Sequence, residues 1–355
     1  MALLSFTPRR IGRFLLALGC ASLTASGTAS AQATAAPKEP SHKEQFLVWE
    51  LNRARSDPQA WAIENAIGVD LSGVEPRPPL ALNESLTGSA FFHADEMGRE
   101  QYCAHQSPVT GEFANQWARD AGYPLNSSLS NGTNSIESIA CGFGNPPQGS
   151  PFQLPLEVLR SLITDAGVVP PGHRNHLLGI GSFEIMREVG AGYASTSTLF
   201  RNYWAVHTGF RDVDPVWLTG VVYADQDQNE LYDEGEGLEG VTVDVGVDSL
   251  QTNGAGGWSL AVAVGAHLVS CTGGSFAGTA SGSVVVSDMN RQVDCISGSD
   301  TLMVDFRVPE PGALALQLAA MVTCGSLAGI RQVGRGGRRR SGRTWRDPLS
   351  GRIRR

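Results

Sequence analysis

A change of pattern at Asp212–Pro215 divides the chain into two parts that belong to different classes of secondary structure. Before it, stretches with helical spacing alternate with short extended ones. After it, from Trp217 to Cys295, the chain is rich in Gly, Val, Thr and Ser, and its apolar residues alternate, which is typical of a β-sheet domain. The DVDP sequence at the change predicts a hinge. The chain is long enough for two hydrophobic cores.

The first segment carries an export signal. Residues 1–31 contain Arg9, Arg10 and Arg13, then an uncharged apolar run, and then Ala29–Ala31. This order of charge, apolar core and small residues predicts a secretory signal peptide that is cleaved after Ala31. A lipoprotein cleavage site at Cys20 is the alternative.

The last segment predicts a membrane tail. Residues 312–330 contain no charged residue, which is about the length needed to cross a bilayer, and the arginines that follow would hold that end in the cytoplasm. A buried core helix is the alternative. With Pro309, Glu310 and Pro311, residues 308–340 resemble the PEP-CTERM sorting tail of Gram-negative bacteria. The resemblance implies processing by an exosortase-type enzyme and release to the cell surface or extracellular matrix, and the basic tail 341–355 departs from it.

Charge excludes one class of partner. The segment 32–330 holds 14 basic and 34 acidic residues, a net charge of −20. Such a chain will not bind nucleic acid through phosphate neutralisation, whereas it suits a solvated exterior or bound divalent ions.

The cysteines indicate an oxidising compartment. Cys20 and Cys324 lie in the two apolar targeting segments, and four cysteines remain. The simplest pairing closes one disulfide in each part, Cys103–Cys141 and Cys271–Cys295. Metal ligation by these thiols is the alternative, although the sequence has no CxxC pair.

The first part predicts an α+β domain. Ser41 followed by Glu44 resembles a capping box that opens a helix, which Pro58 interrupts. Asn83 is expected to cap a second helix. Further helices are expected near residues 111–123 and 155–167, and strands at 136–143, 187–195 and 202–210. Helices and strands interleaved in this way indicate an α+β fold, here a three-layer αβα domain.

This part also resembles a known family, the CAP superfamily of cysteine-rich secretory proteins, antigen 5 and pathogenesis-related proteins, also called SCP domains. The resemblance covers residues 45–211, after a linker at 32–44. It implies an exported fold used for lipid or sterol binding, adhesion and occasionally proteolysis, with the cleft ligand unspecified. The matching stretches are LVWELNRARSDP, CAHQSP, IESIA, PGHRNHLLG and NYWAVHTGF.

The resemblance also implies a cleft with two histidines and two acids. It transfers to His105, Glu137 and His173, and Asp165 is the expected second acid, with Glu157 as the alternative. Such a set can hold Zn²⁺ with a water in an open position, or act in general acid–base catalysis. The favoured function is a non-enzymatic module that binds a metal, a lipid-like ligand or the extracellular matrix. The alternative is a hydrolase that uses the same tetrad.

Four more residues near these motifs have simpler explanations. His93 is expected on a solvated helix surface, His176 at a variable surface position, and His207 in strand packing. Ser107 precedes Pro108 and is explained by turn geometry rather than as a nucleophile.

The second part contains an acidic loop with the spacing of calcium ligands. Positions 1, 3, 5, 7, 9 and 12 of the loop follow the oxygen-ligand pattern of an EF-hand, in which position 7 contributes its backbone carbonyl. The sixth position is Glu230 rather than glycine, so the loop geometry is expected to differ from that of an EF-hand. An acidic surface loop without an ion is the alternative. The expected Ca²⁺ ligands are Asp225, Asp227, Asn229, Leu231, Asp233 and Glu236.

With its flanks, this loop resembles the B-type repeats of Gram-positive adhesins and related prealbumin-like modules. The resemblance covers residues 216–298 and implies a small Ig-like β-sandwich that serves as a calcium-stabilised stalk. A linker at 299–307 would join it to the membrane tail. The sequence therefore predicts an exported, surface-sorted protein with a CAP domain, a β-sandwich and a membrane-anchored precursor.

Overall fold

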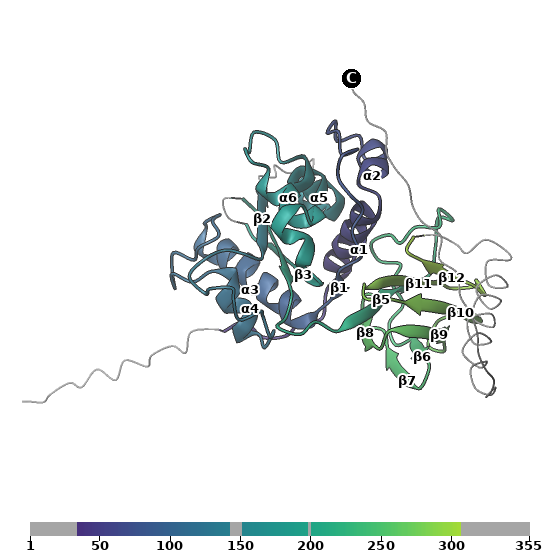
Figure 1. Ribbon diagram of the computed structural model, residues 1–355. Coiled ribbons are helices and arrows are strands. Elements are labelled where there is room, and N and C mark those ends of the chain that lie inside the picture. The colour runs from purple at the N-terminus through teal and green to yellow at the C-terminus, as the bar shows by residue number, and fades with distance from the viewer. Residues whose placement is uncertain (1–33, 143–150, 198–199, 307–355) are drawn as a thin grey trace, which may run out of the picture. The chain divides into compact units, whose positions relative to one another are not determined.

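The computed structural model describes residues 34–142, 151–197 and 200–306, and within them a mixed α+β architecture with three sheets (Figure 1). In the described part of the chain, no helix is long and apolar enough to span a membrane. The predicted signal peptide, the membrane helix 312–330 and the sorting motif at Pro309, Glu310 and Pro311 lie outside the described residues.

The first sheet belongs to the N-terminal half, residues 34–211, and has the strand order β1-β3-β4-β2. The short strand β1 runs parallel to β3, and the other neighbours are antiparallel. Glu137, the first residue of β2, pairs with His207 of β4. The strands are β1 (Ala81–Leu82), β2 (Glu137–Gly142), β3 (Glu188–Ser195) and β4 (Asn202–Gly209).

The helices of the N-terminal half begin where local caps require. Ser41 and Glu44 form the expected capping box, Asp57 and Pro58 start the next helix, and Asn83 caps the helix that follows β1. The helices are α1 (His42–Ser56), α2 (Pro58–Glu64), α3 (Glu84–Glu100), α4 (Ala114–Asp120), α5 (Pro155–Thr164) and α6 (Gly172–Leu178), with short 3₁₀ turns at η1 (Pro151–Gln153) and η2 (Gly181–Ile185).

Helices cover both faces of the first sheet (Figure 1). A Cβ added at Gly190 or Gly192 of β3 would lie about 2 Å from backbone atoms of α3, so α3 packs directly on that face. On the opposite face, the Tyr193 ring lies near Trp204 and near Lys43 of α1. Because strand side chains alternate, Glu137 and His207 point towards α3, while the residues after them, Ser138 and Thr208, point towards α6.

The remaining two sheets form a β-sandwich, residues 216–306. One sheet has the order β12-β11-β5-β8 and the other β10-β9-β6-β7, and their apolar residues share one core. The Cys271–Cys295 disulfide joins β9 to β11 and thus links the two sheets, and Cys103–Cys141 is also formed. The strands are β5 (Val216–Tyr223), β6 (Thr242–Val245), β7 (Asp248–Gln251), β8 (Gly257–Val262), β9 (Gly265–Thr272), β10 (Thr279–Val286), β11 (Arg291–Ile296) and β12 (Leu302–Val304).

Two segments differ from the sequence expectation. The PGHRNHLLG stretch, expected as a loop, forms helix α6 between Gly172 and Leu178. The segment 299–307, expected as a linker, contains β12, which pairs antiparallel with β11 and buries Leu302. The apolar residues of this short strand complete the sandwich core, so the sheet continues past the predicted boundary.

Helix α1 is buried on most of its circumference because it contacts both the first sheet and the sandwich. Trp49 Nε1 donates a hydrogen bond to Asp294 Oδ2 of β11 (2.9 Å), and Asn52 Nδ2 donates one to Gln292 Oε1 (3.2 Å). Phe46 and Trp49 also pack with Tyr232 of the acidic loop. A helix that is buried on several sides does not have a one-sided apolar stripe, and the polar residues Gln45, Glu50 and Asn52 of α1 are accordingly buried too.

Candidate functional site

The predicted cleft histidines come together at the edge of the first sheet. His105 lies in the loop after α3, and His173 lies in the first turn of α6. Their ring centroids are 6.2 Å apart. His105 is 37 % exposed and His173 is 28 % exposed, so both rings are open to solvent on one side.

Each of these histidines is held by a buried carboxylate. His105 Nδ1 lies 2.7 Å from Glu137 Oε2, and His173 Nδ1 lies 2.9 Å from Asp165 Oδ1. A hydrogen bond to a carboxylate fixes the Nδ1–H tautomer, so the Nε2 lone pair of each ring remains for a ligand. Neither Nε2 atom is engaged by a hydrogen bond among the described residues.

Asp165 rather than Glu157 is the second acid beside the histidines. Asp165 ends α5 in the left-handed conformation (φ 47°), and its Oδ2 accepts a hydrogen bond from the backbone N–H of His173 (2.9 Å). The short side chain therefore holds the start of α6 as well as the imidazole. Glu157 is part-exposed and pairs with Arg160 in its own helix.

Glu137 is contacted by two further histidines that the sequence analysis assigned elsewhere. His93 Nδ1 lies 2.5 Å and His207 Nε2 lies 2.9 Å from Glu137 Oε1, and all three side chains are 0 % exposed. The surface assignment of His93 is wrong, because α3 turns this residue onto the first sheet. The packing role expected for His207 is incomplete, since its ring also contacts the carboxylate.

Burial and the histidines act in opposite directions on the Glu137 carboxyl. Burial alone would raise its pKa, but attraction to His93 and hydrogen bonds from His105 and His207 outweigh burial and hold the pKa well below its usual range. Burial lowers the pKa of His207, although its hydrogen bond to Glu137 opposes this. The site therefore keeps an ionised carboxylate beneath the cleft at neutral pH.

His176 and Ser107 have structural roles. His176 was expected at the surface but is buried, with Nδ1 2.8 Å from Ser138 Oγ and Nε2 2.7 Å from Thr208 Oγ1. Burial lowers its pKa to about 3, and neither ring nitrogen is free for a metal. The Ser107 hydroxyl oxygen accepts hydrogen bonds from the N–H groups of Val109 and Thr110, as turn geometry predicts.

A cleft of about 620 Å³ adjoins His173. Its lining includes the polar Asp165 and His173 and the apolar Ile67, Ile139 and Leu162. Its volume and mixed lining are in the range of small-molecule sites.

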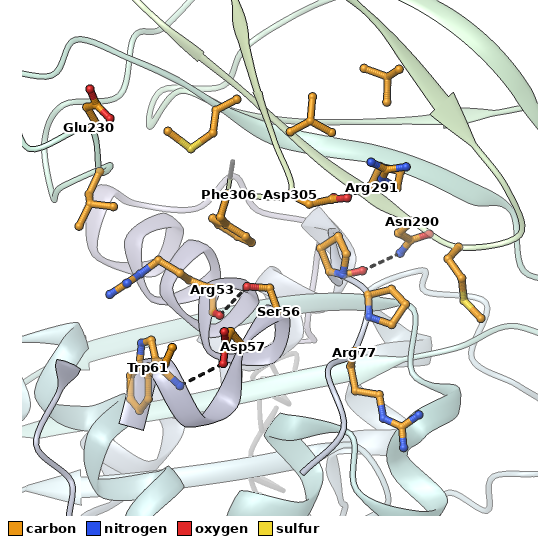
Figure 2. Close-up of a pocket in the computed structure, with 18 of the residues that line it drawn as sticks. Arg53, Ser56, Asp57, Trp61, Arg77, Glu230, Asn290, Arg291, Asp305 and Phe306 are labelled. Atoms are coloured by element: carbon orange, nitrogen blue, oxygen red, sulfur yellow. Dashed lines mark hydrogen bonds and ion pairs between the residues drawn. The ribbon is translucent and has the colours of Figure 1, made fainter. Parts of the chain in front are cut away.

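A larger cavity of about 980 Å³ lies between α1, α2 and the sandwich, and none of its lining residues is a histidine (Figure 2). Figure 2 shows Arg53, Asp57 and Trp61 on the helical side, facing Arg291 and Phe306 from the sandwich. The convergent imidazoles and carboxylates lie elsewhere, so we place the candidate site at the smaller cleft.

The acidic loop lies between β5 and β6. Carboxylate oxygens of Asp225, Asp227 and Glu236 lie within 4.8 Å of one another. Asp225 Oδ2 accepts a hydrogen bond from the N–H of Glu230 (2.9 Å), and Glu230 adopts the left-handed conformation (φ 62°). The sixth position thus makes a sharp turn although it is not glycine.

Comparisons with known proteins give distant structural matches, among them the following two. No protein-family model and no curated protein matches the sequence. An outer surface protein from Borrelia burgdorferi matches 50 % of this chain and 100 % of its own, with 13 % identity and a TM-score of 0.32. An extracellular protein containing a SCP domain from Bacillus anthracis str. Ames matches 47 % of this chain and 40 % of its own, with 15 % identity and a TM-score of 0.28. Both TM-scores are below 0.5, so the function must be inferred from the residues of this chain.

Proposed function

We propose that this chain is an exported, surface-located CAP-type protein whose cleft binds a metal ion, together with a small ligand, and does not turn over a substrate. One observation carries this proposal: two part-exposed imidazoles, His105 and His173, each have Nδ1 held by a buried carboxylate. This is the carboxylate–histidine arrangement that prepares Nε2 for a metal.

The chemistry of these donors fits Zn²⁺. Zinc binds imidazole nitrogen at 2.0–2.1 Å, so two rings that share one ion have centroids about 5 to 6 Å apart. The observed 6.2 Å requires a small movement of the two rings. His105 and His173 would hold the ion, which would supply Lewis acidity towards a polar group of the ligand.

The apolar residues that line the cleft indicate the rest of the ligand. Ile67, Ile139 and Leu162 line the cleft together with Asp165 and His173, so a ligand with a small apolar body and a polar end would satisfy this mixed lining. This supports a lipid-like ligand or an apolar group of a matrix component.

Hydrolysis remains the second candidate, because a carboxylate–imidazole pair is the usual unit of a general base. The hydroxyl of Ser107 is engaged by its own turn, so a hydrolase here would use activated water and not that serine. Turnover of a substrate that is abolished by His105→Ala or His173→Ala would establish this function.

Zinc binding can be measured on the full chain by metal analysis and isothermal titration calorimetry. Zinc in the solvent-open cleft should exchange rapidly with a chelator, and we expect His105→Ala/His173→Ala to lose this rapidly exchanging zinc. The double variant His42→Ala/His267→Ala, which removes two histidines away from the cleft, should retain it. Equal zinc binding by wild type and the cleft variant would refute the proposal.

The acidic loop is proposed to bind Ca²⁺. Asp225, Asp227 and Glu236 supply carboxylates in one cluster, and Ca²⁺ prefers oxygen ligands from such loops. An ion would offset their mutual repulsion, so calcium should raise the unfolding midpoint. Asp225→Ala/Asp227→Ala should abolish the increase, whereas Glu239→Gln, an exposed acid outside the cluster, should leave it. A midpoint unaffected by calcium in wild type would contradict this site.

Surface sorting is proposed from the resemblance of the tail, with an exosortase-type enzyme as partner and a membrane-anchored precursor. Intact mass spectrometry of protein from the cell surface should give a C-terminus near Pro309, Glu310 and Pro311. A mature protein that retains the arginines of 331–355 would exclude cleavage there.

A further inference from the structure

Beneath the cleft, Glu137, His93 and His207 form a second cluster of metal-ligating side chains. One ligand atom of each lies within 4.8 Å of the others, and all three side chains are 0 % exposed. Two imidazoles and one carboxylate are a common protein ligand set for zinc. This set does not include His173, so it differs from the cleft pair.

The buried carboxylate of Glu137 has no strong cationic partner. Among the described residues, only imidazoles lie within ion-pair distance of it, and no lysine or arginine does. An ionised carboxylate without a compensating charge is costly in a protein interior. A divalent cation at Oε1 would provide that charge.

The hydrogen bonds of Ser89 are compatible with a metal ion on His207 Nε2. Ser89 Oγ donates to the Leu86 carbonyl oxygen at 3.0 Å and lies 2.8 Å from His207 Nδ1. A hydroxyl has one proton. When His207 Nε2 binds a metal, the ring carries its proton on Nδ1, and Ser89 Oγ can accept that hydrogen bond while it donates to Leu86.

A zinc ion would take the place of the proton that His207 Nε2 shares with Glu137 Oε1. Bound by His93, His207 and Glu137, whose ligand atoms lie within 4.8 Å of one another, the ion would supply the positive charge that the buried carboxylate lacks. Tetrahedral ligands about 2.0 Å from zinc are about 3.3 Å apart, and the two nitrogen atoms lie 2.5 Å and 2.9 Å from the shared oxygen. Side-chain movements of less than about 1 Å would therefore accommodate the ion.

The surrounding groups orient the ligands. The Ser89–Leu86 chain is the outer hydrogen bond expected for a zinc-bound histidine. The His93 ring is held against Trp117, with a centroid distance of 4.2 Å, and its Nε2 has no hydrogen-bond partner among the described residues. Ring packing therefore orients His93, and a hydrogen bond orients His207.

We infer that His93 Nδ1, His207 Nε2 and Glu137 Oε1 form a buried zinc site in the core of the N-terminal half, separate from the cleft. Glu137 would use its other oxygen to hold His105 at the cleft. The site lacks solvent access, so its ion would be bound during folding and would exchange slowly.

The test uses the full chain, with Zn²⁺ alone as the probe. The protein is refolded with zinc, treated with EDTA for different times, and its zinc content is measured by mass spectrometry. We expect one zinc per chain that is removed only slowly, and that is retained in His105→Ala/His173→Ala. His207→Gln should lose this ion, whereas the control His176→Gln, which alters another buried histidine of the same region, should retain it.

Two results would overturn the inference. One is the absence of slowly exchanging zinc from both wild type and His105→Ala/His173→Ala, and the other is its retention in a folded His207→Gln. If His207→Gln does not fold, X-ray absorption of the zinc-loaded cleft variant decides, because it must show two imidazoles and an oxygen ligand. Absence of rapidly exchanging zinc from wild type, with the slowly exchanging zinc present, would count against the cleft proposal and not against this one.

Discussion

At the residue scale, Glu230 occupies a backbone conformation that suits glycine. Its φ of 62° lies in the left-handed region, which costs an L-residue with a Cβ roughly 1 kcal/mol relative to glycine. Its backbone carbonyl accepts a hydrogen bond from Tyr223 Oη, and this bond does not depend on the side chain. Glu230 therefore strains the backbone at the sixth loop position, and interactions elsewhere in the fold offset this strain.

Glu230→Gly is predicted to stabilise the sandwich by about 1 kcal/mol, because it relieves this strain. The measurement is chemical denaturation with and without calcium. Glu239→Gly is the control, since Glu239 is exposed with an ordinary φ, and glycine there should be neutral or destabilising. Equal effects of the two substitutions would show that the left-handed turn carries no strain.

Asp165 is the residue whose carboxylate determines the orientation of His173. Asp165→Asn keeps an oxygen for the His173 backbone N–H and removes the negative charge beside the imidazole. Since loss of such an outer partner typically costs 10- to 100-fold in metal affinity, we predict that zinc binds in the cleft about 10- to 100-fold more weakly. Competition titration would measure this, and Glu157→Gln should leave the affinity unchanged. An unchanged affinity in Asp165→Asn would remove this residue from the site.

At the scale of single elements, the sequence was sufficient where the structure depends on neighbours along the chain. Ser41 with Glu44, Pro58 and Asn83 act within a few residues, and the structure confirms the helix starts that they predict. The burial of α1 could not be predicted in the same way, because its covering residues, such as Asp294, are more than 200 positions away.

The histidines show the same limit. His93 follows Ala90 by three residues and precedes Met97 by four, so helical spacing alone places it on the buried face of α3. The nearby acids suggested a solvated surface instead. What determines its environment is Glu137 of β2, which only the sheet brings beside it. His176 is buried for a similar reason, since its partners Ser138 and Thr208 come from two strands.

The contact between α1 and β11 is expected to depend on pH through Asp294. This carboxyl is fully buried, and burial raises its pKa from 3.8 to about 6. Folding therefore favours the protonated form, so the stabilisation is complete below about pH 4 and is lost as pH rises to about 6. The shift corresponds to a decrease of about 3 kcal/mol in the free energy of unfolding across this range.

Asp294→Asn should remove that decrease, because the amide does not titrate. Urea denaturation at several pH values would measure the difference between variant and wild type, which cancels the contributions of other groups. The exposed control Asp248→Asn should follow the wild-type profile. A variant whose stability has the same pH dependence as wild type would contradict the assignment to Asp294.

At the scale of the whole molecule, the contact of α1 with both the first sheet and the sandwich predicts that these parts unfold together. Trp49 is central to this contact, since its ring packs on Tyr232 and its Nε1 donates to Asp294. We predict one calorimetric transition for wild type. Trp49→Ala should split it in two, because the substitution removes a buried aromatic side chain at a cost of about 3 to 5 kcal/mol and leaves Asp294 without one donor.

The matched control is Trp117→Ala, which removes a buried tryptophan from the N-terminal half at a site away from the sandwich. It should lower the midpoint of a single transition without splitting it, because the contact between α1 and β11 stays intact. Two separate transitions in wild type would show that the sandwich behaves as the independent stalk expected from the sequence. A single transition that Trp49→Ala splits would instead show that α1 couples cleft and sandwich energetically, so that a ligand bound to one stabilises the other.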